Sequence, residues 1–317
     1  MNHWVIVHLM HSELKITMSN HLLVRRISGM GVFIALIAVV IWLFDVEYVF
    51  RRLAMFWPWT MVSMLALLLA NLVLVSLRLW HILAHFGIVL PWGIAFRASI
   101  AGNFAGLFVM PLFGQIVGRQ LVLNRFGVQS AVNASLAAYE RVMLAVVSGA
   151  LGAVGGLYLL GQTVIARFLE QIALPEIVIA ACGGGVLSLW LGGSRFEAKL
   201  SERLFSRENL ARLILVVGMT FIGQLLMLGS FVVGILTISQ GIPIASLFAA
   251  SAIISLAASL PITVGGWGVR EAAAVYVLSN LGIPAADALA MSVMVGLCSM
   301  LVILASAPFC LRKLSHA

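Results

Sequence analysis

The sequence has few charged residues: only 9% of its 317 residues are Asp, Glu, Lys or Arg. In contrast, 62% are hydrophobic, and the mean hydropathy is +1.12. A soluble domain carries about a quarter charged residues and could not cover this much apolar surface. Several apolar runs reach the roughly 20 residues that cross a hydrocarbon core of about 30 Å. The composition therefore predicts an all-α polytopic membrane protein.

Motifs for common cofactor and catalytic chemistry are also absent from the sequence. Cys182, Cys298 and Cys310 lie in or beside apolar segments without CxxC or Cys/His ligand spacing, so each is expected to be a buried thiol. No Walker, GxSxG, HExxH or Asp-rich metal motif occurs. We expect no cofactor, no metal and no ATP hydrolysis in this chain, and an enzyme is the less favoured class.

The net charge of +8 comes from basic residues that cluster in short loops between apolar segments. This placement favours membrane orientation and contact with anionic lipid headgroups, and we expect no nucleic acid partner.

Eight apolar segments follow one another along the chain, and two of them end in Pro/Gly-rich breaks. They are Ile27–Phe44, Trp59–Leu79, Ile94–Leu112, Ser135–Leu160, Pro175–Gly192, Leu213–Ile238, Ile244–Leu260 and Ala286–Leu311. The third is expected to be interrupted by "AGNFAG" and to end at Pro111. The seventh runs into "SLPITVGGWGVREAA" and continues as a short helix to about Leu281.

Basic residues then constrain the topology. The loop Gly192–Arg212 has five Lys or Arg residues, and further basic pairs lie at Arg25–Arg26 and Arg312–Lys313. All three regions face the cytoplasm only if an even number of spans separates them. Re-entrant hairpins around Pro111 and Pro261 leave six spans and meet this condition. The first hairpin would enter from the cytoplasm and the second from outside.

The domain organisation follows from this topology. We expect an N-terminal tail at residues 1–24, of which residues 1–17 are an irregular tail or a mis-called start. A single transmembrane domain would span residues 25–317, with a charged cytoplasmic loop at 193–212. Both termini are expected in the cytoplasm.

Two short stretches indicate an inverted repeat. "MPLFGQIVGR", Met110 to Arg119, resembles "LPITVGGWGVR", Leu260 to Arg270, and glycine-marked turns are expected after each, at Gly127 and Gly282. Paired broken helices of this kind are a recurrent plan of transporters, with the site between the halves.

The break after Pro261 has two interpretations. Gly265, Gly266 and Gly268 permit irregular backbone, which at membrane depth must line a cavity or be buried in protein. A helix that begins near Arg270, with Glu271 in its first turn, would present its N-terminus and an arginine to a phosphate group. The alternative is a packed kink in which Arg270 and Glu271 pair or snorkel to the surface.

A second charged pair, Glu140 and Arg141, lies in "AYERVML". Adjacent helical residues point about 100° apart, so each needs a partner elsewhere: Arg119 or Arg270 for Glu140, and a ligand anion for Arg141. The alternative is an interfacial pair at the cytoplasmic edge.

Other polar and aromatic residues are expected at the membrane interfaces. Arg78, His81 and His85 would share a wet helical face just after the second span. The interface belt would contain Trp57, Trp59, Trp80 and Trp92.

Together, the Pro–Gly-rich–Arg–Glu block, "MPLFGQIVGRQLVLNRFGV" and "AYERV" resemble the flippase-like transmembrane region of lysylphosphatidylglycerol synthases. The resemblance covers about Arg25 to the end of the chain. In two-domain members a cytosolic aminoacyl-transferase domain follows the membrane region. Here only six residues follow the last apolar segment, so the resemblance implies the lipid-translocating part without the synthase part. Carried over, it implies that charged residues surround a lipid-headgroup cavity, namely Arg119, Glu140, Arg141, Arg270 and Glu271. The candidate site also includes Gly265, Gly266 and Gly268, because glycines let the backbone approach the headgroup closely.

The favoured hypothesis is a lipid flippase or scramblase that moves a phosphate-bearing lipid or glycolipid, and in which Arg270→Ala abolishes transport. One alternative is an integral-membrane enzyme of polyprenyl, hopanoid or glycolipid synthesis that depends on Glu140 or Glu271. Another is a non-catalytic subunit that binds lipid and recruits a synthesis enzyme through the Gly192–Arg212 loop. The small-residue runs "GALGAVGG" and "CGGG" permit helix packing within one chain or between chains.

Overall fold

The computed structural model describes residues 56, 58–108, 111–171, 207–239, 241–259 and 267–311. All of them belong to one compact unit, residues 49–317. They form helices and connecting turns, without a strand in these ranges, which confirms the all-α class. The expected spans Ile27–Phe44 and Pro175–Gly192 and the tail at residues 1–24 lie outside the described residues. So does most of the loop 193–212.

Four helices of the described part are long and apolar enough to cross a membrane. They are α3 (Pro58–His85), α6 (Ser130–Gln171), α9 (Arg207–Ile238) and α12 (Ala285–Ser306), the last followed by α13 (Pro308–Leu311). Helix α6 turns sharply at Gly161, where φ is 73° and ψ is 169°, so its membrane-crossing part is Ser130–Gly161. These helices confirm four of the expected spans. The second span extends to His85, because no proline or glycine lies between Leu79 and His85 to end the helix.

Four shorter helices form two hairpins. Helix α4 (Trp92–Gly106) packs against α5 (Pro111–Leu123), and α10 (Ile244–Ser259) packs against α11 (Val269–Ser279). At roughly 1.5 Å per residue they are about 16–24 Å long, too short to cross a core of about 30 Å. The predicted re-entrant hairpins are therefore present. The prediction that "AGNFAG" interrupts the third segment was wrong, because α4 stays helical through Gly106.

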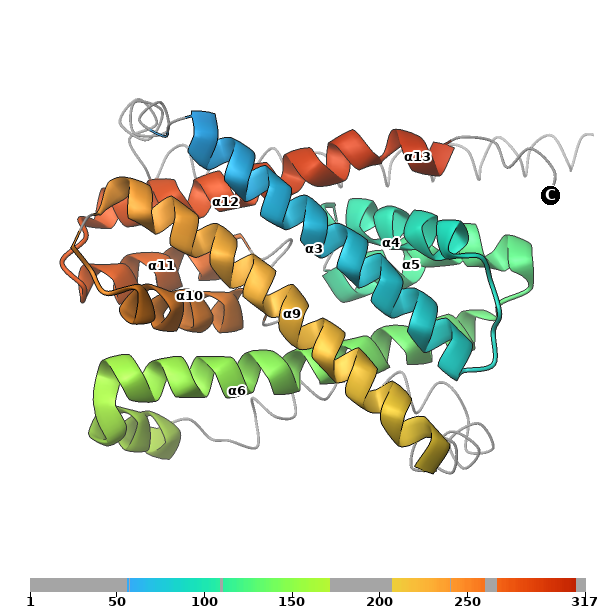
Figure 1. Ribbon diagram of the computed structural model, residues 1–317, viewed down its shortest axis with the longest axis horizontal. Coiled ribbons are helices and arrows are strands. Elements are labelled where there is room, and N and C mark those ends of the chain that lie inside the picture. The colour runs from blue at the N-terminus through green and yellow to red at the C-terminus, as the bar shows by residue number, and fades with distance from the viewer. Residues whose placement is uncertain are drawn as a thin grey trace, which may run out of the picture. The chain divides into compact units, whose positions relative to one another are not determined.

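The two hairpins enter from opposite ends of the long helices, as predicted. In Figure 1, α3 and α9 lie side by side and run in opposite directions, with α4 and α5 on the right and α10 and α11 on the left. Each hairpin also packs on a long helix of the other half, α4 on α12 and α10 on α6. This exchange of partners between antiparallel halves is the arrangement of an inverted repeat.

The turns after α5 and α11 repeat the same local geometry. Helix α5 continues into the short 3-10 helix η1 (Asn124–Phe126), and the turn residue is Gly127 with φ 75°. After α11 the turn residue is Gly282 with φ 83°. In both turns the next N–H returns to a carbonyl five residues earlier, Val128 to Leu123 at 3.3 Å and Ile283 to Leu278 at 3.1 Å. The predicted glycine turns are confirmed.

Glycines bring the helices of the first hairpin into backbone contact. Gly102 and Gly106 on α4 face Gly114 and Gly118 on α5, so both helices carry a GxxxG pattern at their contact. A Cβ on Gly118 would overlap the carbonyl group of Ala101, and a Cβ on Gly114 would overlap the backbone of Gly106. Neither glycine can be replaced without the two helices moving apart.

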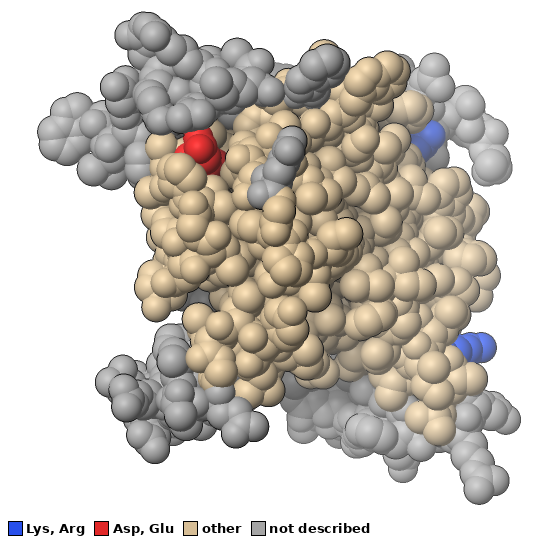
Figure 2. Space-filling view, turned by 60° about the vertical axis from the view of Figure 1, so that its left-hand side comes forward, with Lys and Arg blue, Asp and Glu red and all other residues tan. Residues whose placement is uncertain are grey.

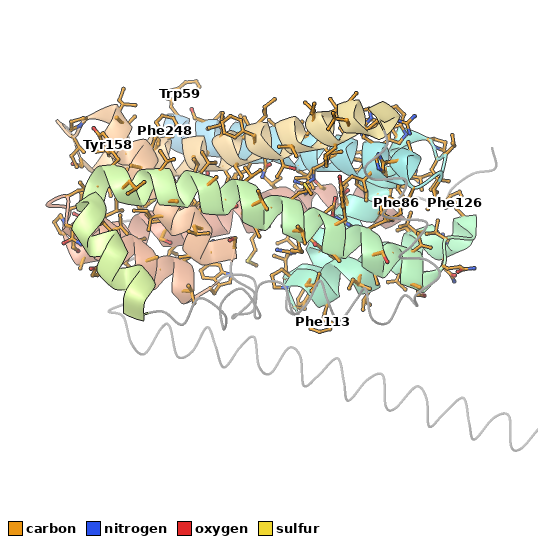
Figure 3. The ribbon with its side chains drawn as sticks, turned by 90° about the horizontal axis from the view of Figure 1, so that it is seen from below. Trp59, Phe86, Phe113, Phe126, Tyr158 and Phe248 are labelled. Carbon is orange, nitrogen blue, oxygen red and sulfur yellow. The ribbon has the colours of Figure 1, made fainter. Side chains whose placement is uncertain are left out.

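The outer surface suits a lipid environment. In Figure 2 the described surface is almost entirely uncharged, and the charged side chains that are visible lie near its margins. Large apolar side chains cover it, among them Leu121 at 71% exposure and Ile214 at 63%. Figure 3 shows Phe113 pointing away from the helices, with Trp59 and Tyr158 toward one end and Phe86 and Phe126 toward the other. Aromatic side chains at both ends are typical of membrane interfaces.

The predicted interface tryptophans fit this arrangement where they are described. Trp59 is exposed, and Trp92 is exposed at the start of α4. Trp80 donates a hydrogen bond from Nε1 to the carbonyl of Leu90 at 2.8 Å, so it also braces the turn that leads into the first hairpin. Trp57 lies outside the described residues.

We expect Gly118→Ala to destabilise the protein by about 1–3 kcal/mol, because the added methyl group must push α4 and α5 apart. Gly149→Ala is the matched control, since a Cβ there meets no atom within 4 Å. That variant should be neutral, or more stable by up to about 1 kcal/mol. Thermal unfolding of the purified proteins in detergent compares the two. Equal unfolding temperatures would contradict the close packing of the hairpin.

Candidate functional site

Charged side chains from three helices meet inside the first half of the protein. Arg119 of α5 and Glu140 of α6 form an ion pair, with 2.5 Å between Nη2 and Oε2. Arg78 of α3 approaches the same carboxylate, with 3.7 Å between Nε and Oε1. Arg141 follows Glu140 on α6. We call Arg78, Arg119, Glu140 and Arg141 the arginine cluster.

The cluster is deeply buried for charged groups. Arg119 is 1% exposed, Glu140 3% and Arg78 7%. Of the two partners predicted for Glu140, the structure selects Arg119. The carboxylate of Glu140 lies inside the protein and pairs with Arg119.

The packing of the first hairpin creates the space for Arg119. The side chain crosses α4 at Gly102, where a Cβ would stand 3.1 Å from Arg119 Cγ and 3.4 Å from Nε. Helix α6 is tied to α5 nearby, because Asn133 donates from Nδ2 to the carbonyl of Ile116 at 2.8 Å. The glycine that lets the helices approach therefore also seats the arginine beside Glu140.

Arg78 was predicted on a wet interfacial face with His81 and His85, and this is wrong for two of the three. Arg78 and His85 are buried, and His81 is half-buried. Arg78 Nη1 donates to Thr220 Oγ1 of α9 at 3.3 Å, and Thr220 in turn donates to the carbonyl of Val216 at 2.7 Å. Because α3 continues beyond Leu79, Arg78 lies roughly two turns inside the helix end. That length was the signal that could have identified it as a site residue.

The cluster carries more positive charge than its single carboxylate offsets. Three arginines face one carboxylate. Among the described residues, four of their buried nitrogens have no hydrogen-bond partner, namely Arg78 Nε, Arg119 Nε, Arg119 Nη1 and Arg141 Nε. Both carboxylate oxygens of Glu140 also have none, so the group is held by ion pairing rather than by hydrogen bonds. Buried donors without partners are rare and costly in folded proteins. Guanidinium groups bind phosphate and carboxylate oxygens through parallel hydrogen bonds, so the chemistry available here is anion binding.

The second predicted group has a different character. Arg270 and Glu271, at the start of α11, pair with each other: Arg270 donates to Glu271 Oε1 from Nε at 2.9 Å and from Nη2 at 2.5 Å. Arg270 Nε also lies 3.3 Å from Ser292 Oγ of α12. The other carboxylate oxygen of Glu271 accepts the N–H of Gly268 at 2.6 Å and so caps the helix. We call Arg270 and Glu271 the α11 pair.

Neighbouring residues fit closely around the α11 pair. The Arg270 guanidinium carbon lies 4.8 Å from the centroid of the Trp267 ring, a cation–π contact. Gly296 of α12 leaves room for the guanidinium, since a Cβ there would overlap it. Arg270 is 5% exposed and Glu271 7%. This is the packed, paired arrangement given above as the alternative for this motif. Gly265 and Gly266 lie outside the described residues.

The two groups belong to different hairpins, and the α11 pair lies beside the middle of α12, at Ser292 and Gly296. The arginine cluster is near the hairpin α4–α5 on the right of Figure 1, and the α11 pair belongs to the hairpin on the left. Among the described residues no ion pair joins them. The described arginines Arg97, Arg125 and Arg212 belong to elements on the right of Figure 1, at the end where the hairpin α4–α5 enters. Asp287 begins α12, which starts at the opposite end. The described charge is therefore strongly asymmetric.

No group of three His, Cys, Asp or Glu side chains that could hold a metal occurs in the described ranges. Cys298 is buried, as predicted, and Cys310 is half-buried with its Sγ 3.3 Å from the carbonyl oxygen of Arg97. Cys182 lies outside the described residues.

Double substitution tests whether Arg270 and Glu271 act as a pair. We expect Arg270→Gln or Glu271→Gln alone to destabilise the protein by about 3–5 kcal/mol, since each leaves a buried charge without its partner. The double variant should be less destabilised than the sum of the two, because it removes both charges. Thermal unfolding of the four proteins measures this coupling. Additive losses would show that the two side chains do not act as a pair.

Comparison with known proteins agrees with this architecture. The family model described as "Lysylphosphatidylglycerol synthase TM region" matches residues 29–307. Neither the search of curated proteins nor that of solved structures found a match. The family match covers most of the chain and includes both hairpins, the arginine cluster and the α11 pair. The chain is a multi-pass membrane protein that belongs to the lysylphosphatidylglycerol synthase transmembrane region family.

Proposed function

We propose that this protein moves a phosphate-bearing lipid or glycolipid across a bacterial cytoplasmic membrane, as a flippase or scramblase. The arginine cluster binds the anionic headgroup, while the hydrocarbon tails stay in the bilayer. The observation that carries the proposal is the set of buried guanidinium N–H groups of Arg78, Arg119 and Arg141 without hydrogen-bond partners among the described residues. A purely structural ion pair would need only one arginine for Glu140.

The architecture supports transport over binding alone. Two re-entrant hairpins enter from opposite ends of an inverted repeat, a plan that in transporters places polar sites inside the membrane. Intramembrane charges cost about 2.5–3.5 kcal/mol each on insertion scales, so their presence argues for a functional role. The family to which the chain belongs takes its name from a lipid synthase. The arginine cluster selects the ligand by its anionic headgroup.

Charge asymmetry supports an orientation. The end that carries Arg97, Arg125 and Arg212 would face the cytoplasm under the positive-inside rule. In that orientation the arginine cluster receives headgroups from the cytoplasmic leaflet and both termini are cytoplasmic.

Arg141→Gln tests the proposal with little structural disturbance, since Arg141 forms no ion pair with a described residue. We expect translocation of NBD-labelled phosphatidylglycerol in proteoliposomes to fall about tenfold to a hundredfold, the effect of losing one charge-assisted hydrogen bond. Dithionite quenching measures the rate. Arg125→Gln is the matched control, because Arg125 is exposed after α5, and it should translocate like the wild type.

The outcomes separate the hypotheses. No translocation by the wild type of any labelled anionic lipid would contradict the proposal and favour an enzyme or a lipid-binding subunit. Equal rates for wild type, Arg141→Gln and Arg125→Gln would contradict the assignment of the arginine cluster to the headgroup.

A further inference from the structure

Two amide side chains lie halfway along the antiparallel helices α3 and α9. Asn71 is at the middle of α3 (Pro58–His85), and Gln224 is at the middle of the apolar stretch Leu210–Ile238 of α9. The two helices pack together, and Asn71 Oδ1 would stand 3.1 Å from a Cβ on Gly223, the residue before Gln224. We call Asn71 and Gln224 the midplane amides.

A hydroxyl group from the second hairpin orients one of them. Ser255 of α10 donates from Oγ to Gln224 Oε1 at 3.1 Å, and Ser255 is buried. The amide oxygen of Gln224 is thereby held toward α10. Its NH₂ group is the end that can donate to an anion or a hydroxyl group. Asn103 holds the corresponding position in the other hairpin, since it is the twelfth residue of α4 and Ser255 is the twelfth residue of α10. Both hairpins therefore place a polar side chain at the same point of their first helix.

On α9, polar side chains one helical turn apart lead from the arginine cluster to the midplane amides. Arg78 of the cluster is bonded to Thr220, and Gln224 follows Thr220 by one helical turn, about 6 Å along the axis. On α3, Asn71 precedes Arg78 by seven residues, or two turns, which places the two on the same side of the helix. Polar groups therefore extend from the cluster to the centre of the bundle.

Amides in the middle of apolar helices need a reason. Ser/Asn/Gln hydrogen bonds between membrane helices can act as glue, but each contributes only modestly to association. An uncharged donor has a second use on a transport path. A transported anion must be bound firmly enough to enter and weakly enough to leave, so a strong site needs a weaker one beyond it.

We propose that the midplane amides form a second, uncharged binding site, called the station, which the lipid headgroup occupies after it leaves the arginine cluster. Ser255 is the residue that positions Gln224 in this site. This inference rests on the proposed function. The station offers amide N–H groups to phosphate and hydroxyl oxygens of the headgroup. It lowers the barrier at the centre of the membrane and adds little to the affinity of the cluster.

Gln224→Leu tests the station, and Asn71→Leu is the second variant should the first not fold. NBD-phosphatidylglycerol in vesicles of phosphatidylethanolamine and phosphatidylglycerol is the probe. We expect translocation to slow about tenfold, the rate effect of roughly one lost hydrogen bond to the moving headgroup. Retention of phosphatidylglycerol by the purified variant should stay as in the wild type, since the arginine cluster is intact.

A matched control removes a hydrogen bond between the same two helices away from their middle. Thr60 Oγ1 and Thr237 Oγ1 lie 3.1 Å apart, so Thr237→Val removes that bond at the far end of α3 and α9. This variant should translocate at the wild-type rate. Ser255→Ala should slow translocation less than Gln224→Leu does, because it frees the amide without removing it.

Each result bears on a different claim. A loss in Thr237→Val as large as in Gln224→Leu, or wild-type rates in both amide variants, would overturn the station and leave the proposed function standing. Loss of phosphatidylglycerol retention in Gln224→Leu would also overturn it, since the amide would then belong to the binding site itself. No translocation by the wild type would overturn the proposed function and the station together.

Discussion

The ion pair between Arg119 and Glu140 places two charges inside a bundle whose outer face is apolar. Charge at this depth must be paired, hydrogen-bonded or solvated, so the surrounding helices are arranged to meet it. The close contact of α4 and α5 seats Arg119, and α3 and α9 bring Arg78 and Thr220 to the same place. Glu140 offsets only part of the positive charge. The remainder makes the group suited to an anionic ligand.

The internal repeat gives the two hairpins the same architecture but different chemistry. In the first, the arginine lies well inside α5 and shares its carboxylate with Arg78. In the second, Arg270 is in the first turn of α11 and closes on its neighbour Glu271, whose other oxygen caps the helix. The first hairpin thus adjoins arginine donors without hydrogen-bond partners, whereas the second holds a satisfied pair. This difference makes the arginine cluster the stronger candidate for the headgroup, with the midplane amides beyond it.

Apolar length and Pro/Gly breaks were enough to predict the described spans and both hairpins, because membrane crossing imposes fixed lengths on helices. The partner of Glu140 was one of two arginines that the sequence allowed. Arg78 was missed because its role depends on α3 running on to His85 and on α9 lying beside it. Of the two interpretations of Arg270, the structure shows the one in which it pairs with Glu271. The choice depends on the turn at Gly268, whose N–H binds the other oxygen of Glu271, and sequence spacing alone does not determine that turn.

Mass spectrometry of the lipids retained by the gently purified protein tests the central claim most directly. Wild type, Arg119→Gln and Arg270→Gln are compared with the lipids of the membrane from which they came. The account predicts that the wild type enriches one phosphate-bearing lipid class, that Arg119→Gln loses the enrichment, and that Arg270→Gln keeps it. Lipids in membrane proportions in all three proteins would contradict a headgroup site at the arginine cluster.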